Sequence, residues 1–330
     1  MKLHSTIAIL GLAALGLATS VSITADAQAA NKKCLFVSSY HRGYQHADDV
    51  EQGLRSVLKG KCDVRQFDMD TKRLKSEAMK QKQALEAKAI IESWKPDIVI
   101  TADDNAAKYL IKPYYKDHKL PFVFCGLNWT AAEYGFPYSN ATGMIEVGPI
   151  IPMLERARKI TGTMERVFYV GADALSEEKN LKRFQRAAER LGFKLEYALA
   201  GTTDAWLKAY QRAQDYDFVI IGNRHGIKDW DHDKAVAGML KITRKLSVTN
   251  HSWMMPYTIL GVTKVSREQG EWAAKIALKI LGGMPLSNIP IVPNSRRDIW
   301  INGEFLKVAE VKFSPSLLRK GKKFAGLKLK

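Results

Sequence analysis

The stretch GMIEVGPIIPMLERARKITGTMERVFYVG, residues 143–171, decides how the chain is organised. It opens with the apolar run Gly143–Val147, which is typical of a buried strand. Two prolines then interrupt the chain, and a helical pattern covers Met153–Thr161. A new series of apolar runs starts at Arg166. This arrangement predicts two similar α/β lobes that meet near residue 147, rather than one long sheet.

Short apolar runs alternate with longer amphipathic stretches on both sides of this point. The runs that predict strands are Leu35–Tyr40, Val64–Met69, Ile98–Ala102, Phe122–Leu127, Gly143–Val147, Arg166–Gly171, Lys194–Leu199, Phe218–Gly222, Ser247–Asn250, Thr258–Val262 and Ile299–Ile301. Because most runs are continuous rather than alternating, they indicate strands buried on both faces, as in parallel sheets. The predicted fold class is α/β, with two Rossmann-like lobes on parallel sheets joined by a hinge.

The stretches between these runs predict helices. Val50, Leu54, Val57 and Leu58 share one face of a helix. Ser266 and Gln269 have the spacing of a capping box, which predicts that a helix begins there and continues to the glycine pair 282–283. Alternation of strands and helices at this length implies βαβ units with right-handed crossovers.

The charge of the chain is strongly positive. Its 330 residues carry 51 Lys and Arg against 34 Asp and Glu, a formal net charge of +17. Such an excess is compatible with nucleic acid, an anionic membrane surface, an anionic ligand or an anionic partner. From residue 312 onward every charged residue is basic. We expect this C-terminal tail to be a solvated surface.

Residues 1–29 have the pattern of a cleavable signal peptide. A short polar start precedes the apolar run Ile7–Ala18, and Ala27-Gln28-Ala29 matches the small-x-small cleavage pattern. The apolar run is shorter than the roughly 20 residues of a membrane span, although an uncleaved anchor is the alternative. We therefore expect export to the periplasm, with a mature chain that starts near Ala30. Export argues against nucleic acid as a partner, and none is expected.

The chain has three cysteines, which is too few for a scaffold that depends on many disulfides. Cys34 opens the first predicted strand and Cys62 just precedes the second. If these strands are parallel neighbours, both cysteines lie at the same sheet edge, where a Cys34–Cys62 disulfide is plausible in an oxidising compartment. Three free thiols are the alternative. Cys125 lies inside a strand run and is expected to be a buried free thiol.

Ligands of open α/β sheets bind beyond the carboxyl ends of the strands, and polar and aromatic residues gather there in this sequence. The first-lobe candidates are Tyr40, His41, Tyr44, Asp103, Asn128, Trp129 and Glu146. The second-lobe candidates are Asp173, Asn223, Arg224, Asn250 and Trp253. Planar aromatics beside amide and charged groups suit a small polar ligand, and Arg224 is the expected partner of a carboxylate or other anion. Each residue also has a structural alternative as a helix cap, a core aromatic or a turn residue.

Enzymatic signatures are missing from the sequence. It contains no G-x-G-x-x-G motif after the first strand, no phosphate-binding loop motif and no G-x-S-x-G motif. Two groups of His and Asp, around His41 and around His232, do not have a metal-binding spacing. We therefore expect no enzyme activity, no cofactor and no metal. The stretch Asp229–Asp233 is expected to be a polar loop before a helix.

Three stretches resemble one known family. The first stretch is Leu120–Phe124 with Asn140–Gly143, which is similar to the family's IPIVF and N-x-TG motifs. The second is Gly261–Pro285, and the third is Ile301–Leu318. On these stretches the chain resembles the ABC-transporter substrate-binding proteins related to bacterial tryptophan/tyrosine-binding proteins. It departs from the family at Asn128-Trp129, where an Asp-containing stretch is usual. Its loop after the first strand looks like that of a subgroup found beside sensor kinases.

The resemblance implies a type I periplasmic-binding-protein fold and a substrate-binding function. A small polar ligand, such as an amino acid or another small organic anion, would be captured between two closing lobes and delivered to an inner-membrane ABC permease by a monomer. A co-receptor for a membrane sensor kinase is the alternative, and a secreted α/β hydrolase is a third. The expected organisation is a signal peptide at 1–29, lobe 1 at 30–146 plus 258–288, and lobe 2 at 147–257 plus 289–330. Hinge segments are implied near 146–149, 256–263 and 286–298.

Overall fold

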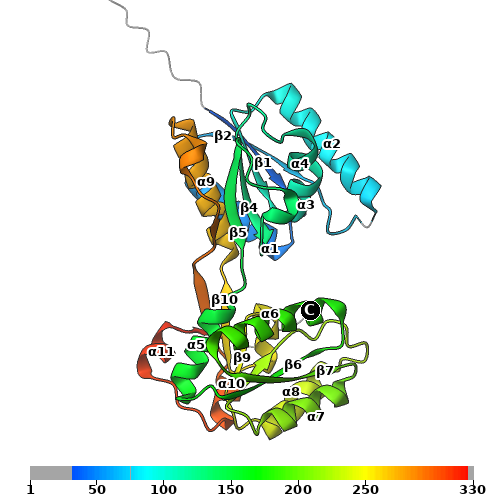
Figure 1. Cartoon of the computed structure of the whole chain (residues 1–330), viewed down its shortest axis with the longest axis vertical. Helices are drawn as coiled ribbons and strands as arrows, with labels where there is room; N and C mark the ends of the chain where they lie inside the picture. The colour runs from blue at the N-terminus through cyan, green and yellow to red at the C-terminus, as the bar shows by residue number, and fades with distance from the viewer. Residues whose placement is uncertain (1–31, 75, 326–330) are drawn as a thin grey trace, which may run out of the picture. The chain divides into compact units, whose positions relative to one another are not determined.

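A computed structural model describes residues 32–74 and 76–325 (Figure 1). The predicted signal peptide and its cleavage point lie outside these residues. Within the described part of the chain, no helix combines the length and the apolar character that crossing a membrane would need.

The first sheet has six strands in the order β11-β5-β4-β3-β1-β2, and all of its neighbouring strands are parallel. Its strands are β1 (Lys33–Ser38), β2 (Asp63–Asp68), β3 (Ile98–Ala102), β4 (Phe122–Asn128), β5 (Ala141–Glu146) and β11 (Val292–Pro293). Every residue of β3 is buried, and so is every residue of β1 after Lys33. The continuous apolar runs therefore correspond to central strands covered on both faces.

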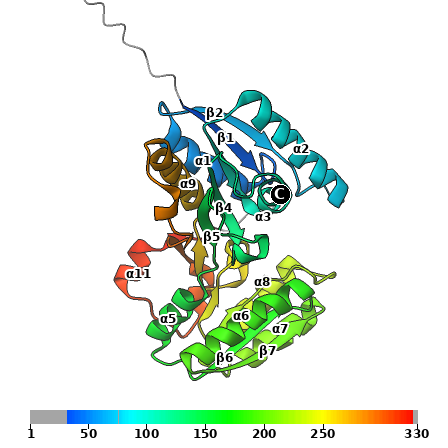
Figure 2. The same ribbon diagram turned by 45° about the horizontal axis from the view of Figure 1, so that its top comes forward.

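Helices cover the two faces of this sheet separately. They are α1 (Gln45–Leu58), α2 (Glu77–Trp94), α3 (Asp103–Ala106), η1 (Ala107–Ile111), α4 (Lys112–Tyr114), η2 (Ala132–Tyr134), α9 (Ser266–Leu281) and η4 (Leu286–Asn288). Figures 1 and 2 show α1 and α9 on one side of the sheet and α2 and α3 on the other. Val50, Leu54 and Leu58 are buried, as the helical pattern predicts.

The second sheet has seven strands in the order β13-β12-β10-β9-β8-β6-β7. Its strands are β6 (Arg166–Ala172), β7 (Lys194–Ala200), β8 (Phe218–Ile221), β9 (Ser247–Thr249), β10 (Leu260–Lys264), β12 (Arg297–Ile301) and β13 (Lys322–Lys323). All pairs are parallel except β10 with β12. The two parallel-sheet lobes of the predicted α/β fold are thus confirmed, with one antiparallel pair.

The helices of the second lobe lie on both faces of its sheet. They are α5 (Ile150–Thr161), α6 (Leu175–Leu191), α7 (Thr203–Ala213), α8 (His232–Ile242), η3 (Ser252–Tyr257), α10 (Gly303–Val308) and α11 (Pro315–Lys320). Figure 1 shows α5 and α6 on one face and α7 and α8 on the other. Trp206, Tyr169 and Phe184 are among the largest fully buried side chains of this lobe.

The chain crosses between the sheets after β5, after β10 and after β11. Strand β10 pairs with β9 and β12, although the range 258–288 was expected in lobe 1. Strand β11 pairs with β5, although the range 289–330 was expected in lobe 2. Strand pairing therefore places both of these boundaries a few residues later than expected. A strand joins a sheet through its pairing partner, and the partner of β11 is β5, about half the chain away. A local sequence pattern therefore cannot predict which sheet β11 joins.

The predicted capping box of α9 is wrong. Val265 occupies the cap position. The hydroxyl of Ser266 lies 2.9 Å from Nδ1 of His46, and Oε1 of Gln269 accepts a hydrogen bond from the backbone N–H of Gly126 at 3.0 Å. Contacts with α1 and β4 thus replace the local cap, because both side chains face elements already packed against α9.

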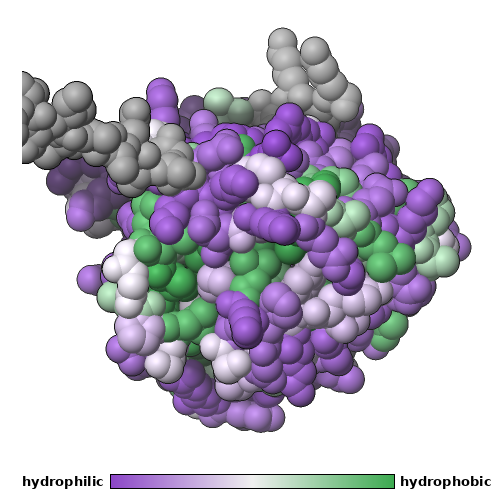
Figure 3. Space-filling model, turned by 90° about the horizontal axis from the view of Figure 1, so that it is seen from above, coloured by the Kyte–Doolittle hydropathy of each residue, from purple (hydrophilic) through white to green (hydrophobic). Residues whose placement is uncertain are grey.

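The C-terminal tail is a solvated surface only in part. Up to residue 325, its charged side chains are exposed, including Lys320 and Lys323. However, Leu317 is buried and β13 pairs with Trp300 and Ile301 of β12, so the backbone is anchored to the second sheet. Figure 3 shows a face of the molecule on which hydrophilic residues surround smaller groups of hydrophobic ones.

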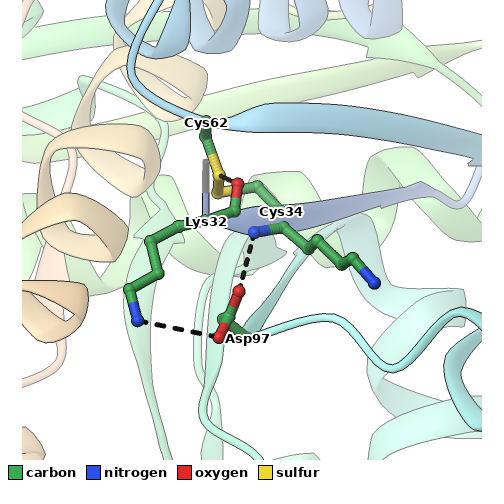
Figure 4. The surroundings of a disulfide bond; sticks show 5 residues. Lys32, Cys34, Cys62 and Asp97 are labelled. Atoms are coloured by element: carbon green, nitrogen blue, oxygen red, sulfur yellow. Dashed lines mark hydrogen bonds and ion pairs between the residues drawn. A yellow bond between two sulfur atoms is a disulfide. The ribbon is translucent and has the colours of Figure 1, made fainter. Parts of the chain in front are cut away.

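A disulfide joins Cys34 and Cys62, whose Cα atoms lie 6.0 Å apart (Figure 4). The parallel pairing of β1 with β2 brings them together, as predicted. Close by, one carboxylate oxygen of Asp97 accepts a hydrogen bond from the backbone N–H of Lys33 at 2.7 Å. The other oxygen lies 3.8 Å from Nζ of Lys32. Cys125 is a buried free cysteine, also as predicted.

We predict that the Cys34→Ala/Cys62→Ala variant loses about 3–4 kcal/mol of unfolding free energy, because the bridge closes a loop with a sequence separation of 28 residues. Chemical denaturation of the wild type and the variant measures this loss. Titration of the unfolded, unreduced wild type should find one reactive thiol, that of Cys125. Three reactive thiols would contradict the bridge.

Helices α1 and α9 pack with their backbones close together, as Figure 2 shows. A Cβ atom on Gly270 would lie 1.9 Å from the carbonyl oxygen of Val50 and 2.8 Å from the backbone nitrogen of Leu54. A Cβ atom on Gly53 would lie 2.3 Å from the carbonyl oxygen of Arg267. This contact holds α9 on the first sheet after the chain has passed through the second.

Gly270→Ala should therefore lower the unfolding free energy by about 1–3 kcal/mol or more, because neither backbone can move away without disturbing the helix. Gly201→Ala is the matched control: nothing lies within 4 Å of the added Cβ. The control should change stability by less than about 1 kcal/mol. Equal effects of the two substitutions in urea unfolding would show that the helices are not in close contact.

Candidate functional site

Three carboxylates gather at the carboxyl end of the first sheet. Asp103 and Asp104 follow β3, and Glu146 is the last residue of β5. Asp103 is 3% exposed and Glu146 is 4% exposed. The Oδ2 atom of Asp103 and the Oε2 atom of Glu146 are buried and have no hydrogen-bond partner among the described residues. Asp103 has a positive φ of 68° and does not cap α3, whose cap position is Ala102.

Asp104 is fully occupied, in contrast to its neighbour. It accepts hydrogen bonds from the backbone N–H of Asn128 at 3.1 Å, from the Asn128 amide at 2.6 Å and from the Tyr134 hydroxyl at 2.8 Å. The predicted binding residue Asn128 is therefore tied to its own lobe. Its side chain fixes the end of β4 against α3.

His46 lies among these carboxylates, although the sequence does not single it out as a ligand-binding residue. Its Nε2 atom is 3.0 Å from Oδ1 of Asp103, and its Nδ1 atom is 3.7 Å from Oε2 of Glu146. Glu146 also pairs with Lys264, the last residue of β10. Burial lowers the pKa of His46, but Asp103 and Glu146 together raise it above its usual value. In the sequence, His46 stands out only as a member of the His and Asp group around His41, whose spacing does not fit a metal site.

Tyr40 and Tyr44 form an aromatic corner in the loop between β1 and α1. Their rings meet edge to face with centroids 5.3 Å apart. The ammonium of Lys72 lies 4.7 Å from the Tyr40 ring and 4.8 Å from the Tyr44 ring. Burial, with Asp103 as the next contributor, raises the pKa of Tyr40 far above 10. Tyr40 is therefore a neutral hydroxyl close to the carboxylates.

His41 and Trp129 contact other parts of the chain. Nδ1 of His41 lies 3.3 Å from Oδ1 of Asp70 in the loop after β2. Trp129 has a positive φ of 65°, and its ring lies 4.2 Å from the guanidinium of Arg183 in α6. A Cβ on Gly148 would lie 3.3 Å from the same ring. Trp129 thus packs at the crossing segment after β5.

At the strand ends of the second sheet, Glu177 organises a buried network that the sequence did not predict. It accepts hydrogen bonds from the backbone N–H of Asn223 at 2.7 Å and from the hydroxyl of Tyr169. Burial raises the pKa of Glu177. A Cβ on Gly222 would lie 1.9 Å from its Oε1 atom, so the glycine at the end of β8 makes room for this carboxyl group. That strand-end glycine was the available signal.

Asn223 is also linked to Trp253. Its Oδ1 atom accepts hydrogen bonds from the backbone N–H of His225 at 3.1 Å and from the Trp253 indole N–H at 3.3 Å. The Trp253 ring stacks on His251 with centroids 4.5 Å apart and remains 43% exposed. Burial, with Lys264 and His225 nearby, lowers the pKa of His251 to about 4. His251 is therefore neutral at neutral pH, and Trp253 presents an exposed aromatic surface.

Arg224 lies against an aromatic wall. Its guanidinium is 5.5 Å from the Trp230 ring, and its Nε atom is buried without a hydrogen-bond partner among the described residues. Trp230 donates a hydrogen bond to the Tyr257 hydroxyl at 3.0 Å, and His232 contacts that hydroxyl at 2.7 Å. The Trp230 ring packs against Arg224, and the Nε atom of Arg224 remains available to donate a hydrogen bond.

Asn250 and Asp173 differ in their surroundings. Asn250 is buried, and its Oδ1 atom has no hydrogen-bond partner among the described residues. Its Nδ2 atom would lie 3.2 Å from a Cβ on Gly148, which places it beside the first crossing segment. Asp173 is exposed and does not cap α6, because Ala174 takes that position.

The buried polar atoms without partners are concentrated at predicted binding residues. Nine such side-chain atoms occur in the described part of the chain, and five of them belong to predicted residues. These five residues are Asp103, Glu146, Arg224, Asn250 and His41, and the His41 Nδ1 atom makes no hydrogen bond but has an ion-pair contact with Asp70 at 3.3 Å. Since more than about nine in ten buried polar groups in proteins are satisfied, this concentration marks the strand ends as a candidate binding site.

Among the residues that the structure describes, no three His, Cys, Asp or Glu side chains are arranged so that they could hold a metal ion. Asp231 caps α8 by accepting the backbone N–H of Lys234 at 3.0 Å. Asp229 accepts the backbone N–H of Thr203 at 3.1 Å. A polar loop does lead into a helix here, as predicted, but the loop ends at Asp231, because α8 already begins at His232.

No protein-family model and no curated protein matches this sequence, but solved structures match its fold. CD0873 from Clostridium difficile, a substrate binding protein with adhesive properties, matches in its ligand-free, open form with a TM-score of 0.71 at 13% identity, over 89% of this chain and 99% of that chain. An ABC domain in complex with L-Trp from Streptococcus pneumonia has a TM-score of 0.55 at 14% identity, over 88% and 99%. A conserved domain protein from Vibrio cholerae has a TM-score of 0.53 at 15% identity, over 89% and 99%.

The chain has the type I periplasmic-binding-protein fold. The resemblance drawn from the sequence motifs is thereby confirmed at the level of fold. The first of these structures is a substrate-binding protein, and the second is a domain bound to an amino acid. The candidate residues of this chain lie at the carboxyl ends of its strands, which is where open α/β sheets bind their ligands.

We predict that His46→Gln lowers the unfolding free energy by about 3–5 kcal/mol, because it removes the cation paired with the buried Asp103. The folded-state pKa of His46 is raised, so its stabilising effect is complete below about pH 6.5 and is lost as pH rises through the folded pKa. Urea unfolding between pH 5.5 and 9 measures this slope, which the variant should lack. His118→Gln, at an exposed position, is the control. An unchanged pH slope in His46→Gln would contradict the pairing.

Proposed function

We propose that this protein is an exported substrate-binding protein of an ABC importer. It captures a small polar ligand between its two lobes and, as a monomer, delivers the ligand to an inner-membrane permease. The observation that carries this proposal is the concentration of unpartnered buried polar atoms at the strand ends of both sheets. A ligand would supply the missing hydrogen bonds, whose absence is costly in a buried site.

The proposed contacts come from both lobes. Tyr40, Tyr44, Asp103 and Glu146 act from the first lobe, and Arg224, Asn250 and Trp253 act from the second. Asn128, Trp129 and Asn223 already have partners within the chain and act by positioning these groups. The exposed ring of Trp253 provides a stacking surface for an apolar or planar part of the ligand.

Export to the periplasm is the second part of this proposal. Residues 1–29 act as the cleavable signal peptide. The Cys34–Cys62 disulfide supports this location, because such bonds persist in oxidising compartments and are rare in the cytosol.

A thermal-shift screen tests the proposed function. A compound at 100 times its Kd should stabilise the protein by about 2.7 kcal/mol. The panel covers amino acids, organic acids, amines, sugars and nucleosides. The proposed function is contradicted if every class fails to raise the melting temperature.

Arg224→Gln should weaken binding of carboxylate-bearing compounds at least tenfold, since a charged hydrogen bond is worth about 1.5–3 kcal/mol. Calorimetric titration measures the change in Kd. Arg186→Gln, on the exposed face of α6, is the matched control and should bind as the wild type does. If both variants retain full affinity, Arg224 does not hold the anionic group.

A further inference from the structure

We propose that the ligand carries a protonated amine, and that Lys72 is a tethered ammonium that occupies the Tyr40–Tyr44 corner until the ligand's ammonium displaces it. This inference rests on the proposed function, because it names the chemical class of ligand for the same site.

The geometry at Lys72 is that of an ammonium held by two aromatic walls. Its Nζ atom lies within 4.8 Å of both ring centroids, inside the roughly 6 Å range of a cation–π contact. The two rings stand at 81° to each other, so they enclose the cation from two sides. Pairs and cages of aromatic rings are a common way to recognise alkylammonium ligands.

Lys72 has the properties of an occupant that can leave. It is exposed and lies in the loop that follows β2. In the part of the chain described, no carboxylate oxygen comes within 4.0 Å of its ammonium. A lysine side chain has a flexible four-carbon stem, so releasing its head group requires no backbone change. The tyrosines are its contacts, and the same contacts would suit any ammonium of similar size.

The electrostatic environment of this corner favours a cation over an anion. Tyr40 lies close enough to Asp103, Asp104 and Glu146 for their charges to act on its hydroxyl. The facing cations are His46, paired with Asp103, and Lys264, paired with Glu146. On a chain with a net charge of +17, three carboxylates at one sheet end form a local acidic region. The three carboxylates stand against two cations, His46 and Lys264, so this sheet end keeps one net negative charge before Lys72 is counted.

The unpartnered oxygens supply what a ligand ammonium needs. An ammonium has three donors and no acceptor. Asp103 Oδ2 and Glu146 Oε2 are buried and accept no hydrogen bond from the described residues, although Nδ1 of His46 lies 3.7 Å from the Glu146 oxygen. A ligand ammonium that reaches these oxygens gains charge-assisted hydrogen bonds in addition to ring contacts. Lys72, whose ammonium makes only the ring contacts, is then displaced.

Calorimetric titration with matched compounds tests the ligand class. Each set consists of an amino acid, the amine that remains after decarboxylation and the acid that remains after removal of the amino group. Compounds with the amine should bind, and their amine-free acids should bind at least tenfold more weakly. Equal binding of the amine-free acids overturns the inference but leaves the proposed function standing. Failure of every compound to bind overturns both.

Substitutions at Lys72 test its role as a tethered competitor. Lys72→Met keeps the length of the side chain and removes the charge, so it should tighten amine binding about 3- to 10-fold, the size of one or two cation–π contacts. Lys72→Arg retains a cation and should bind as the wild type does. Lys61→Met, at an exposed position before β2, is the matched control and should have no effect. Unchanged or weaker binding in Lys72→Met overturns the competitor role.

Substitutions at Tyr44 test the aromatic corner itself. Tyr44→Phe keeps the ring and should retain affinity for amines, whereas Tyr44→Leu should lose about tenfold. Equal affinity of the Phe and Leu variants, with melting temperatures like that of the wild type, overturns the aromatic contact.

Discussion

The ion pair between Glu146 and Lys264 joins the last residues of β5 and β10, at two of the points where the chain passes from one sheet to the other. Glu146 is almost fully buried, so this charge depends on its partners. His46 adds a third group, since it contacts both Glu146 and Asp103. The crossing segments and the acidic strand ends thus form one electrostatic unit. Any change in the charges at the candidate site therefore acts directly on the segments that connect the lobes.

The two lobes contribute different chemistry to the candidate site. The first lobe presents carboxylates and tyrosine rings, and the second presents an arginine, a buried amide and an exposed tryptophan ring. This division is opposite to what the overall charge suggests, because the acidic groups lie inside a strongly basic protein. The net positive charge and the acidic strand ends are therefore separate features of the chain. The surface charge suits attraction to an anionic membrane face or an acidic partner, whereas the strand ends suit a small ligand.

The sequence could point to the strand ends as a candidate site, but it could not predict which side chains contact one another there. The strand-end residues were identified because parallel strands present their carboxyl ends at one edge. Asn128 and Trp129 then prove to be held by Asp104 and Arg183, which come from α3 and α6. His46 and Glu177 were missed, because burial of a polar side chain beneath a strand end depends on which helix covers that end. For Glu177, the feature of the sequence that reflects this burial is Gly222, whose missing side chain leaves room for the carboxyl group.

The α/β class and the longer strands of both lobes follow from the sequence alone, because they depend on apolar periodicity, whereas the short strands β11 and β13 were not predicted. The sequence made the Cys34–Cys62 disulfide one of two alternatives, and the structure contains it. The sheet that receives β10 and β11, and the side chains that share the acidic strand ends, depend on contacts between distant parts of the chain. The physical reason is the range of the interactions. Periodicity reports burial within a few residues, whereas hydrogen bonds and ion pairs, such as that of Lys264 with Glu146, join residues more than a hundred positions apart.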